Sequence, residues 1–553
     1  PAIAAISGNL RDNLLRPLFW DQRENRYTQG QQQFLGSITG TYTFNDMFTL
    51  RLRGGTNQYF NLNETSERWL AVSNPGVLTD NQGRYGRTQA QTSRNYGEAL
   101  LMFNKALGKD FKVSANAGSS VDDSYDYSEN LETRGLRVND VFAFNNNKNT
   151  TLGLVANNFG RGGERYTAVF GSAQLAFKEY LFLEMTARND WSSRLPDYSR
   201  SYFYPSVGLS FILSQAVKLP EVISHAKVRT SYAEVGNTTP SRYFANETYT
   251  NGSYLQGNGT SATTSSIPAS VPPTNIVAEK NKSFEFGLET AYFKDRLNLD
   301  ITYFNNRGTN LLSSAIVASS SGAASLRANT GSLANSGFEI TLGADVIRTR
   351  DFAWHADFNT SLVKRKVIDL GEGFSSVNGL PPERTLGNPF GAIFKAVVGS
   401  APYDIYMTKW ARNAEGQFIV DASGNLTAGA LSYMGSSLPK AYGGLSNRFS
   451  YKGFDMQVML AYRFGGKIVS YTNSYLLASG AGTGSLWGRD AEHGGLPFYT
   501  AGGVNILYTG QTIPTGSTLR NDGVIIDGVK ADGTKNNIIV PVSTYYNNRY
   551  RGT

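Results

Sequence analysis

The stretch KSFEFGLETAYFKDRLNLDITYFNN, residues 282–306, contains the pattern that decides the fold. After a short turn at 294–296, apolar and polar residues alternate: the apolar positions are Leu297, Leu299, Ile301 and Tyr303, and the polar ones are Asn298, Asp300 and Thr302. Successive side chains of a β-strand point to opposite faces, so this alternation predicts a strand. The stretch therefore predicts a hairpin in a sheet with one apolar and one polar face.

The same alternation recurs along most of the chain, and it predicts about fifteen strands of about 10–13 residues, longer than the usual strands of globular sheets. The predicted strands are 33–43, 47–58, 94–106, 111–121, 165–177, 181–190, 202–213, 224–235, 282–293, 296–306, 336–347, 352–364, 390–399, 440–450 and 454–464. The end of the chain is less regular, and Val524-Ile525-Ile526 and Ile538-Ile539-Val540 are candidates for loop hairpins.

Very short turns alternate with very long polar stretches between these strands. The short turns are 44–47, 108–110, 178–180, 294–296 and 451–453, and the long stretches are 57–92, 122–163, 236–280 and 306–335. A further segment, 401–439, is expected to form a small hairpin or to fold over the mouth. An antiparallel barrel in an outer membrane has short turns on one rim and long loops on the other. We therefore expect an all-β protein, a large antiparallel transmembrane β-barrel with long extracellular loops.

Composition agrees with this fold and narrows the function. The 553 residues include 12% aromatics, suited to the aromatic girdles of a barrel, and no run of about 18 apolar residues. The mean hydropathy is −0.32. Cysteine is absent and only three histidines occur, far apart, so thiolate and histidine-based centres are not expected. The net charge of +8 is scattered, which argues against nucleic-acid binding and suits a surface among anionic lipopolysaccharide.

The charged residues on the polar faces of these strands are expected to line an aqueous lumen, where they stay hydrated without buried partners. They are Glu285, Glu289, Asp300, Glu339, Asp345 and Arg463.

No motif in the chain carries enzymatic chemistry. The glycine-rich runs 160–163 and 480–484 lack the ending of a phosphate-binding loop, and loop flexibility explains them better. Asp122, Asp123 and Asp126 have spacing reminiscent of a calcium loop without its glycine and closing glutamate, so a loop-bound Ca²⁺ stays open. We expect no enzyme activity, no catalytic residue and no cofactor, and we assign no residue as a metal ligand.

Aromatic residues in the expected external loops are the candidate binding residues, because flat aromatic faces suit sugar rings or apolar peptide side chains. For any single one of them, packing of the loops against one another is the better explanation. The candidates are Tyr125, Tyr127, Tyr254, Tyr403, Tyr406, Trp410 and Trp487.

Several stretches resemble the SusC/RagA family of TonB-dependent outer-membrane transporters of Bacteroidota. In order, they are TARNDWSS (186–193), SYFYPSVGLSF (201–211), KVRTSYAEVGN (227–237), EKNKSFEFGLE (279–289), NSGFE (335–339), LPKAYGGLSN (438–447) and YKGFD (451–455). The resemblance covers about 180–465 and is weaker before 160 and after 490. Its motifs identify the family rather than a binding site.

The resemblance implies a 22-stranded barrel in the outer membrane that imports a glycan or peptide oligomer. It also implies energy from TonB, a SusD-like lipoprotein lid, and a pairing of two such complexes. No TonB box, plug motif or terminal strand is recognisable, so we expect residues 1–553 to be part of one barrel domain, with the N-terminal plug outside this chain. Two alternatives stay open: a structural or secretion-associated barrel that scaffolds surface proteins, and a soluble β-rich adhesin.

Overall fold

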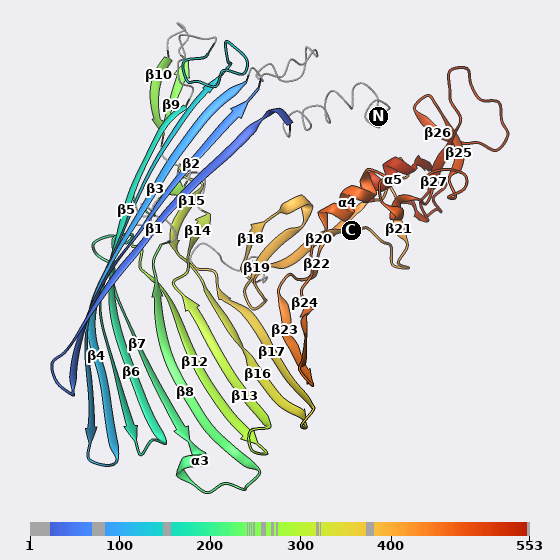
Figure 1. Ribbon diagram of the computed structural model, residues 1–553. Helices are drawn as coiled ribbons and strands as arrows, with labels where there is room; N and C mark the ends of the chain where they lie inside the picture. The colour runs from blue at the N-terminus through green and yellow to red at the C-terminus, as the bar shows by residue number, and fades with distance from the viewer. Residues whose placement is uncertain are drawn as a thin grey trace. The chain divides into compact units, whose positions relative to one another are not determined.

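The computed structural model describes residues 23–68, 83–147, 156–239, 242, 244, 246, 249–255, 261–266, 270–271, 275–316, 320, 322–371 and 381–549. Its main element is an antiparallel sheet of fourteen strands that pair in chain order (Figure 1). These wall strands are β1 (Arg26–Thr43), β2 (Phe48–Glu67), β3 (Arg84–Leu107), β4 (Phe111–Arg134), β5 (Ala156–Phe177), β6 (Leu181–Ser192), β7 (Ser201–Ile212), β8 (Ile223–Asn237), β12 (Glu279–Tyr292), β13 (Leu297–Thr309), β16 (Ser332–Arg348), β17 (Phe352–Asp369), β23 (Pro439–Tyr451) and β24 (Phe454–Gly465).

The remaining elements are short. The strands are β9 (Thr250–Leu255), β10 (Ser261–Ser266), β11 (Ser270–Val271), β14 (Leu312–Ile316), β15 (Ser325–Asn329), β18 (Glu383–Gly387), β19 (Ile393–Val397), β20 (Asp404–Trp410), β21 (Phe418–Ile419), β22 (Ala428–Ser436), β25 (Leu496–Ala501), β26 (Val504–Leu507), β27 (Arg520–Ile525), β28 (Gly528–Val529) and β29 (Ile539–Pro541). The helices are α3 (Leu213–Ala216), η4 (Pro389–Gly391), α4 (Tyr471–Ala478), η5 (Thr483–Ser485) and α5 (Val542–Arg549). Among the described helices, none combines the length and apolar content needed to cross a membrane.

Fourteen of the fifteen predicted wall strands are confirmed, and one prediction was wrong. Segment 390–399 contains β19, which pairs with β18 and β20 in a separate four-stranded sheet. Ala396 of this strand packs with Val367 and Leu370 in a buried cluster, and Val397 is buried as well. A short apolar run that is buried on both sides looks like a wall strand in the sequence, although it lacks the polar face of one.

The chain divides into two compact units. The first comprises residues 1–216, 229–282 and 317–329, and the second comprises residues 217–228, 283–316 and 330–553.

In the first unit, tight turns join β1 to β2, β3 to β4 and β5 to β6, as predicted (Figure 1). Lys178 and Glu179 both have positive φ angles, 47° and 57°, as the commonest two-residue hairpin turn requires. Phe177 and Tyr180 flank this turn with their ring centroids 5.5 Å apart, and Phe111 lies 4.8 Å from Phe177. These rings form an aromatic belt at the tight-turn end, as expected of a barrel girdle.

The predicted loops 57–92 and 122–163 begin too early, because the strands continue into them. Strand β2 pairs with β3 from Phe48↔Phe103 to Glu67↔Arg84, and β4 pairs with β5 up to Glu132↔Ala156. Both faces of these extensions are rich in Asn, Gln, Thr, Arg and Glu. A strand that leaves the apolar part of the membrane can be polar on both faces, so it loses the alternation by which the sequence identifies it.

In the second unit, the strand register sorts side chains into rows that cross the wall. Leu299, Leu342, Phe358, Leu445 and Leu460 form one apolar row. One residue along, the row is Asp300, Thr341, Asn359, Gly444 and Ala461, on the opposite face. The predicted alternation is confirmed, and the apolar face is the one suited to lipid.

The polar face carries the predicted lumen residues, several of which have partners that the sequence did not suggest. Glu289 lies 3.2 Å from Lys227, and Asp345 lies 2.7 Å from Nδ1 of His355. Glu339 accepts a hydrogen bond of 3.2 Å from Ser361. These partners lie on the same partly exposed face, because long side chains on neighbouring strands reach one another across a row.

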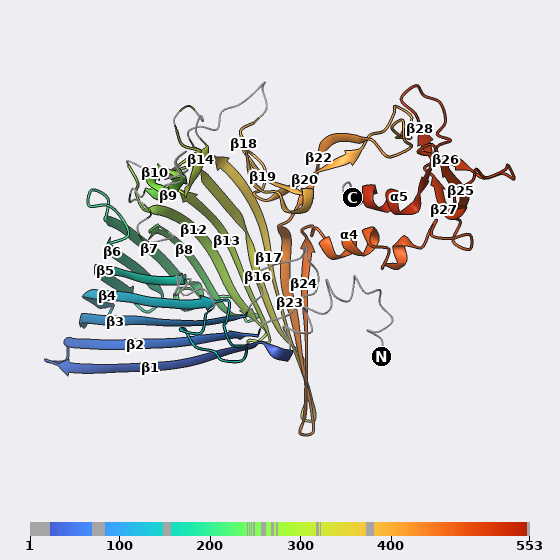
Figure 2. The ribbon, with the colours of Figure 1, turned by 90° about the horizontal axis from the view of Figure 1, so that it is seen from above.

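Residues 381–438 and 466–549 form the part of the second unit that we call the loop module. The first segment connects β17 to β23 and the second follows β24, so both leave the wall at the end opposite the tight turns. Val524 pairs with Val540 and Ile525 with Ile539, so the two segments named as candidates for loop hairpins pair with each other. Helices α4 and α5 lie side by side (Figure 2). The module's core consists of Val420, Val524, Ile526, Val540, Val542 and Tyr546.

Candidate aromatic binding site

Two of the predicted binding residues, Trp410 and Trp487, meet at one cavity in the loop module. The cavity has a volume of about 650 Å³, within the range of small-molecule sites. Its wall combines aromatic rings, two cations and one carboxylate: Lys409, Trp410, Arg412, Phe418, Trp487, Asp527 and Tyr545.

Backbone hydrogen bonds between distant segments position these side chains. The amide of Ile419 donates to the carbonyl of Ala411 at 3.0 Å, which folds β21 back beside the end of β20. The amide of Val420 donates to the carbonyl of Val529 at 2.9 Å, and β21 pairs in parallel with β28. The hairpin that carries Trp410 is thereby joined to the segment that carries Ile525, Ile526 and Asp527.

Aromatic contacts set the orientation of the cavity wall. The Trp487 and Tyr545 rings meet edge to face at 5.3 Å, and the Tyr546 hydroxyl donates to the Trp487 carbonyl at 3.2 Å. The guanidinium carbon of Arg412 lies 3.8 Å from the centre of the Phe418 ring, a cation–π contact. The cavity thus offers flat apolar surfaces beside positive charge, which suits a ring or planar group that carries hydrogen-bond acceptors.

The indole nitrogen of Trp410 is buried and has no hydrogen-bond partner among the described residues. Unpaired buried donors are uncommon in folded proteins, and each one costs free energy.

Tyr403 and Tyr406 lie in the same module but are not part of this wall. The Tyr406 ring packs edge to face on Tyr433 at 5.6 Å, and the ammonium group of Lys395 lies 5.0 Å from the centre of the Tyr406 ring. Burial raises the pKa of the Tyr406 hydroxyl. Tyr403 is a turn residue with φ 63°, and its carbonyl accepts hydrogen bonds from the backbone and side chain of Ser437.

The expected loop location was wrong for Tyr125 and Tyr127, which lie on strand β4. The Tyr127 hydroxyl donates to Glu129 at 3.3 Å, and the guanidinium of Arg161 lies 5.7 Å from the centre of its ring. Tyr254 lies on β9, opposite Ala262 of β10; its side chain lies outside the described residues. Polar strand extensions account for the first two misassignments, as they do for the early loop boundaries.

The three aspartates with calcium-like spacing each pair with an arginine. Asp122 lies 2.6 Å from Arg94, Asp123 lies 2.9 Å from Arg165, and Asp126 lies 2.5 Å from Arg242. Because successive residues of a strand point to opposite faces, Asp122 and Asp123 are also directed to different faces of β4. Ion pairing is the role that the structure gives these carboxylates.

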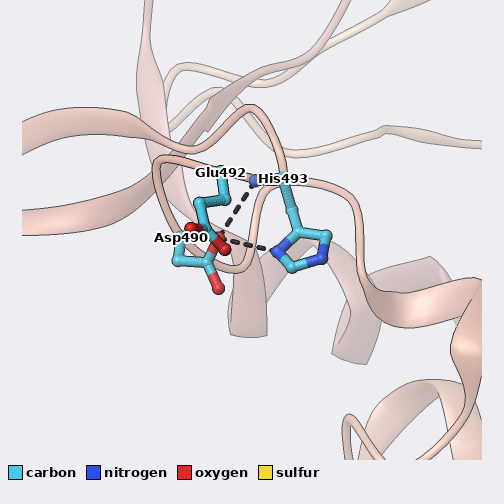
Figure 3. Close-up of side chains that lie close together, drawn as sticks. All are labelled: Asp490, Glu492 and His493. Carbon is cyan, nitrogen blue, oxygen red and sulfur yellow. Dashed lines mark hydrogen bonds and ion pairs between the residues drawn. The ribbon is translucent and has the colours of Figure 1, made fainter.

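Asp490, Glu492 and His493 bring three possible metal-ligand atoms within 4.8 Å of one another (Figure 3). Asp490 accepts hydrogen bonds from the backbone amide of His493 at 3.0 Å and from its ring at 2.7 Å. These hydrogen bonds from His493 lower the pKa of the Asp490 carboxyl. They also close a turn at 490–493, and that turn accounts for the cluster.

Sequence reasoning missed Arg412, Phe418 and Tyr545. Phe418 lies in a turn-rich stretch without periodicity, and Tyr545 lies far from it in the chain, on α5. The one available signal was the excess of aromatic residues in the polar, aperiodic segments after 400.

Comparison with known proteins shows the family to which this chain belongs. The family model described as "TonB dependent receptor-like, beta-barrel" matches residues 4–510. TonB-dependent receptor P26 of Formosa agariphila is 24% identical over 453 residues, which are 77% of this chain and 44% of that protein. TonB-dependent receptor SusC of Bacteroides thetaiotaomicron is 26% identical over 294 residues, 51% of this chain and 29% of that protein. The chain thus spans less than half the length of these relatives.

Solved structures show the same fold. The structure of the RagAB peptide transporter superposes with a TM-score of 0.71 at 18% identity, covering 83% of this chain and 50% of that one. The predicted barrel fold, outer-membrane location and resemblance to SusC and RagA are thereby confirmed, and the family is one of transporters and receptors rather than enzymes. This chain belongs to the TonB dependent receptor-like β-barrel family of outer-membrane proteins.

Proposed function

We propose that this chain is part of a transporter that imports an oligomeric nutrient, a glycan or a peptide, across the outer membrane. The observation that carries the proposal is the aromatic cavity between Trp410 and Trp487. Its loop module leaves the wall at the end opposite the tight turns, which in outer-membrane barrels is the extracellular end. An aromatic site there would capture an oligomer before it enters the barrel.

The polar face of the wall supports passage of a hydrated solute. Asp300, Glu339 and Arg463 lie on this face, and a wet interior would keep such charged groups hydrated. In this proposal the oligomer stacks on Trp410 and Trp487, and the cations Lys409 and Arg412 orient its acceptors. Tyr403 and Tyr406 of the same module would contact further sugars or amino acids of the oligomer. Tyr125, Tyr127 and Tyr254 belong to the first unit and stay candidate binding residues there.

The proposal includes partners that the SusC and RagA likeness suggests. A SusD-like lipoprotein would cover the extracellular mouth, two such pairs would associate, and TonB would supply energy through an N-terminal plug. Mass spectrometry of the complex, purified from outer membranes in mild detergent, tests the lid directly. Recovery of the barrel without a lipoprotein would count against this part of the proposal and leave the cavity to be tested separately.

Substitution of the two tryptophans tests the cavity. Arrays of oligosaccharides and of mixed oligopeptides first identify a ligand of the purified complex. Trp410→Ala and Trp487→Ala should each weaken its binding at least about tenfold, because truncation of an aromatic anchor commonly costs more than 1 kcal/mol. Growth on that oligomer as sole nutrient should slow in parallel.

Trp191→Ala is the matched control, since Trp191 lies at the end of β6, in the first unit. It should leave binding unchanged. If all three variants bound the oligomer as well as the unsubstituted protein does, the cavity would not be its binding site. A deletion strain that grows normally on every oligomer tested would favour the alternative, a barrel that scaffolds surface proteins.

A further inference from the structure

A second hollow, which shares no lining residue with the aromatic cavity, lies at the end of the wall next to the loop module. It has a volume of about 600 Å³, and residues of β13, β16, β17 and β23 line it together with Ala401, Ser436 and Leu438 of the loop module. Its apolar wall includes Tyr303, Phe338 and Leu362. Phe338 and Leu362 are 46% and 43% exposed, so their side chains are open to whatever surrounds the barrel.

The strand register gives the hollow its place on the wall. Tyr303 pairs with Phe338 and Phe338 with Leu362, so the three form one cross-strand row. Ser336 and Lys364 form the next outward-facing row, one step toward the loop module. An apolar row therefore lies directly below a row with a positive charge.

The depth of this row matches the outer edge of the lipid-facing band. At the tight-turn end, Trp354 stacks on Phe449 at 5.6 Å, and Phe352 pairs with Tyr451. Leu362 lies ten residues beyond Phe352 on the same strand, which at about 3.3 Å per residue and a tilt of about 40° is a height of roughly 25 Å. Apolar bands of barrels are about 25 Å tall. Leu362 thus lies at the upper edge of the band and Lys364 at the level of the lipid headgroups.

The charge around the hollow has one sign. Lys364, Arg365 and Lys440 are among its lining residues, and no carboxylate is. Arg365 donates a hydrogen bond of 2.9 Å to the carbonyl of Pro439. Lys364 and Lys440 are exposed, and neither has an ion-pair or hydrogen-bond partner within the part of the chain that the structure describes. Two unengaged ammonium groups above an apolar surface are complementary to an anionic amphiphile.

We propose that this hollow binds one phosphorylated lipid of the outer leaflet. An acyl chain would lie against Tyr303, Phe338 and Leu362, and a phosphate would lie between Lys364 and Lys440. The site stands apart from the imported oligomer, and it does not depend on the proposed uptake function. Because Ser436 and Leu438 contribute to it, a bound lipid would also hold the start of β23 and the adjoining loop module to the wall.

Native mass spectrometry of the full-length protein in mild detergent tests the proposal, with diphosphorylated lipid A as the probe. The double variant K364A/K440A should bind lipid A about thirtyfold more weakly, as expected for the loss of two cations near an anionic lipid. The control K105A/K112A removes two exposed lysines near the turn at 108–110 and should bind normally. Heat-modifiable gel mobility establishes that each variant is folded.

Three further measurements separate the lipid from a free anion. Lipid A without phosphates should bind as weakly as K364A/K440A binds the intact lipid, and inorganic phosphate should displace intact lipid A only at far higher concentration. Phe338→Ser should weaken lipid A binding and leave the weak binding of inorganic phosphate unchanged. Full binding by K364A/K440A, or equal binding of the dephosphorylated lipid, would overturn the proposal. Displacement by phosphate at the concentration of the lipid would make the site a free-anion site instead.

Discussion

The wall strands and the loop module of the second unit place apolar residues in opposite ways. Phe338 and Leu362 of the wall are 46% and 43% exposed, whereas Phe498 and Val524 of the module are 0% and 1% exposed. The wall keeps its polar groups on one face and directs its apolar rows outward, to lipid. The module surrounds an apolar core with polar loops, as a water-soluble domain does. One chain thus contains a part suited to lipid and a part suited to water, and the change from one to the other occurs within a few residues of Asp369 and Gly465.

The largest effect is expected from a substitution that unfolds the loop module and leaves the wall folded. Phe498→Ala removes a fully buried ring and should destabilise the module by about 3–5 kcal/mol. Limited proteolysis should then cut residues 466–549 rapidly, while the heat-modifiable gel mobility of the barrel stays unchanged. Val504→Ala, at an exposed position of the same sheet, is the control and should resist cleavage. Loss of barrel mobility in Phe498→Ala would mean that wall and module fold as one.

A second substitution pair tests which solvent each face of the wall meets. Leu342→Arg places a charge in the middle of the lipid-facing row and should cost about 2–4 kcal/mol in folding into lipid vesicles. Thr341→Arg, on the next residue, faces the polar row beside Asp300 and should cost much less. Denaturant titration of both variants in vesicles measures the difference. Equal costs would show that both faces meet the same environment.

A smaller effect on stability is expected from Asp404, a buried carboxyl group in the first segment of the loop module. Asp404 is almost fully buried, and its Oδ1 has no hydrogen-bond partner among the described residues. Burial raises the pKa of this carboxyl, and a hydrogen bond with Ser436 offsets only part of the shift. The folded state therefore holds the proton more tightly than the unfolded state, and stability falls as pH rises between the two pKa values.

Asp404→Asn should consequently be more stable than the parent protein at pH 7, above the ordinary carboxyl pKa, because burial penalises the charged carboxylate. The difference should shrink as pH falls toward the ordinary carboxyl pKa of about 3.9, because the parent then becomes neutral too. Amide hydrogen exchange of β20 and β22 in both proteins, compared at each pH, measures it. Glu415→Gln, at an exposed turn position, should show no such trend. A stability difference that grows at low pH would contradict a raised pKa for the Asp404 carboxyl.

Much of the wall could be predicted because alternation is a local property. Residues 297–303 and 454–464 show it over nearly their whole length, and both are wall strands with the predicted faces. The prediction failed where that signal is absent or ambiguous. Residues 57–67 and 84–92 are polar on both faces and were assigned to a loop, and segment 390–399 is apolar on both faces and was assigned to the wall.

The candidate site could be predicted only in part. Trp410 and Trp487 were among the predicted residues, yet nothing in their surroundings indicated that they meet. Tyr125 and Tyr127 have the same composition-based signal and lie on a wall strand instead. An aromatic residue in a polar segment has no periodicity to say which other residue it faces.

By itself, the sequence determined the strand faces, the tight turns, the outer-membrane setting and the family likeness, because each depends on residues that are neighbours in the chain. Only the tertiary structure decided that Arg412, Phe418 and Tyr545 join the two tryptophans around one cavity. Only the tertiary structure, likewise, brought Lys364 and Lys440 together above an apolar row. Both arrangements depend on strand register and on the pairing of distant segments, and these follow from the packing of the whole chain.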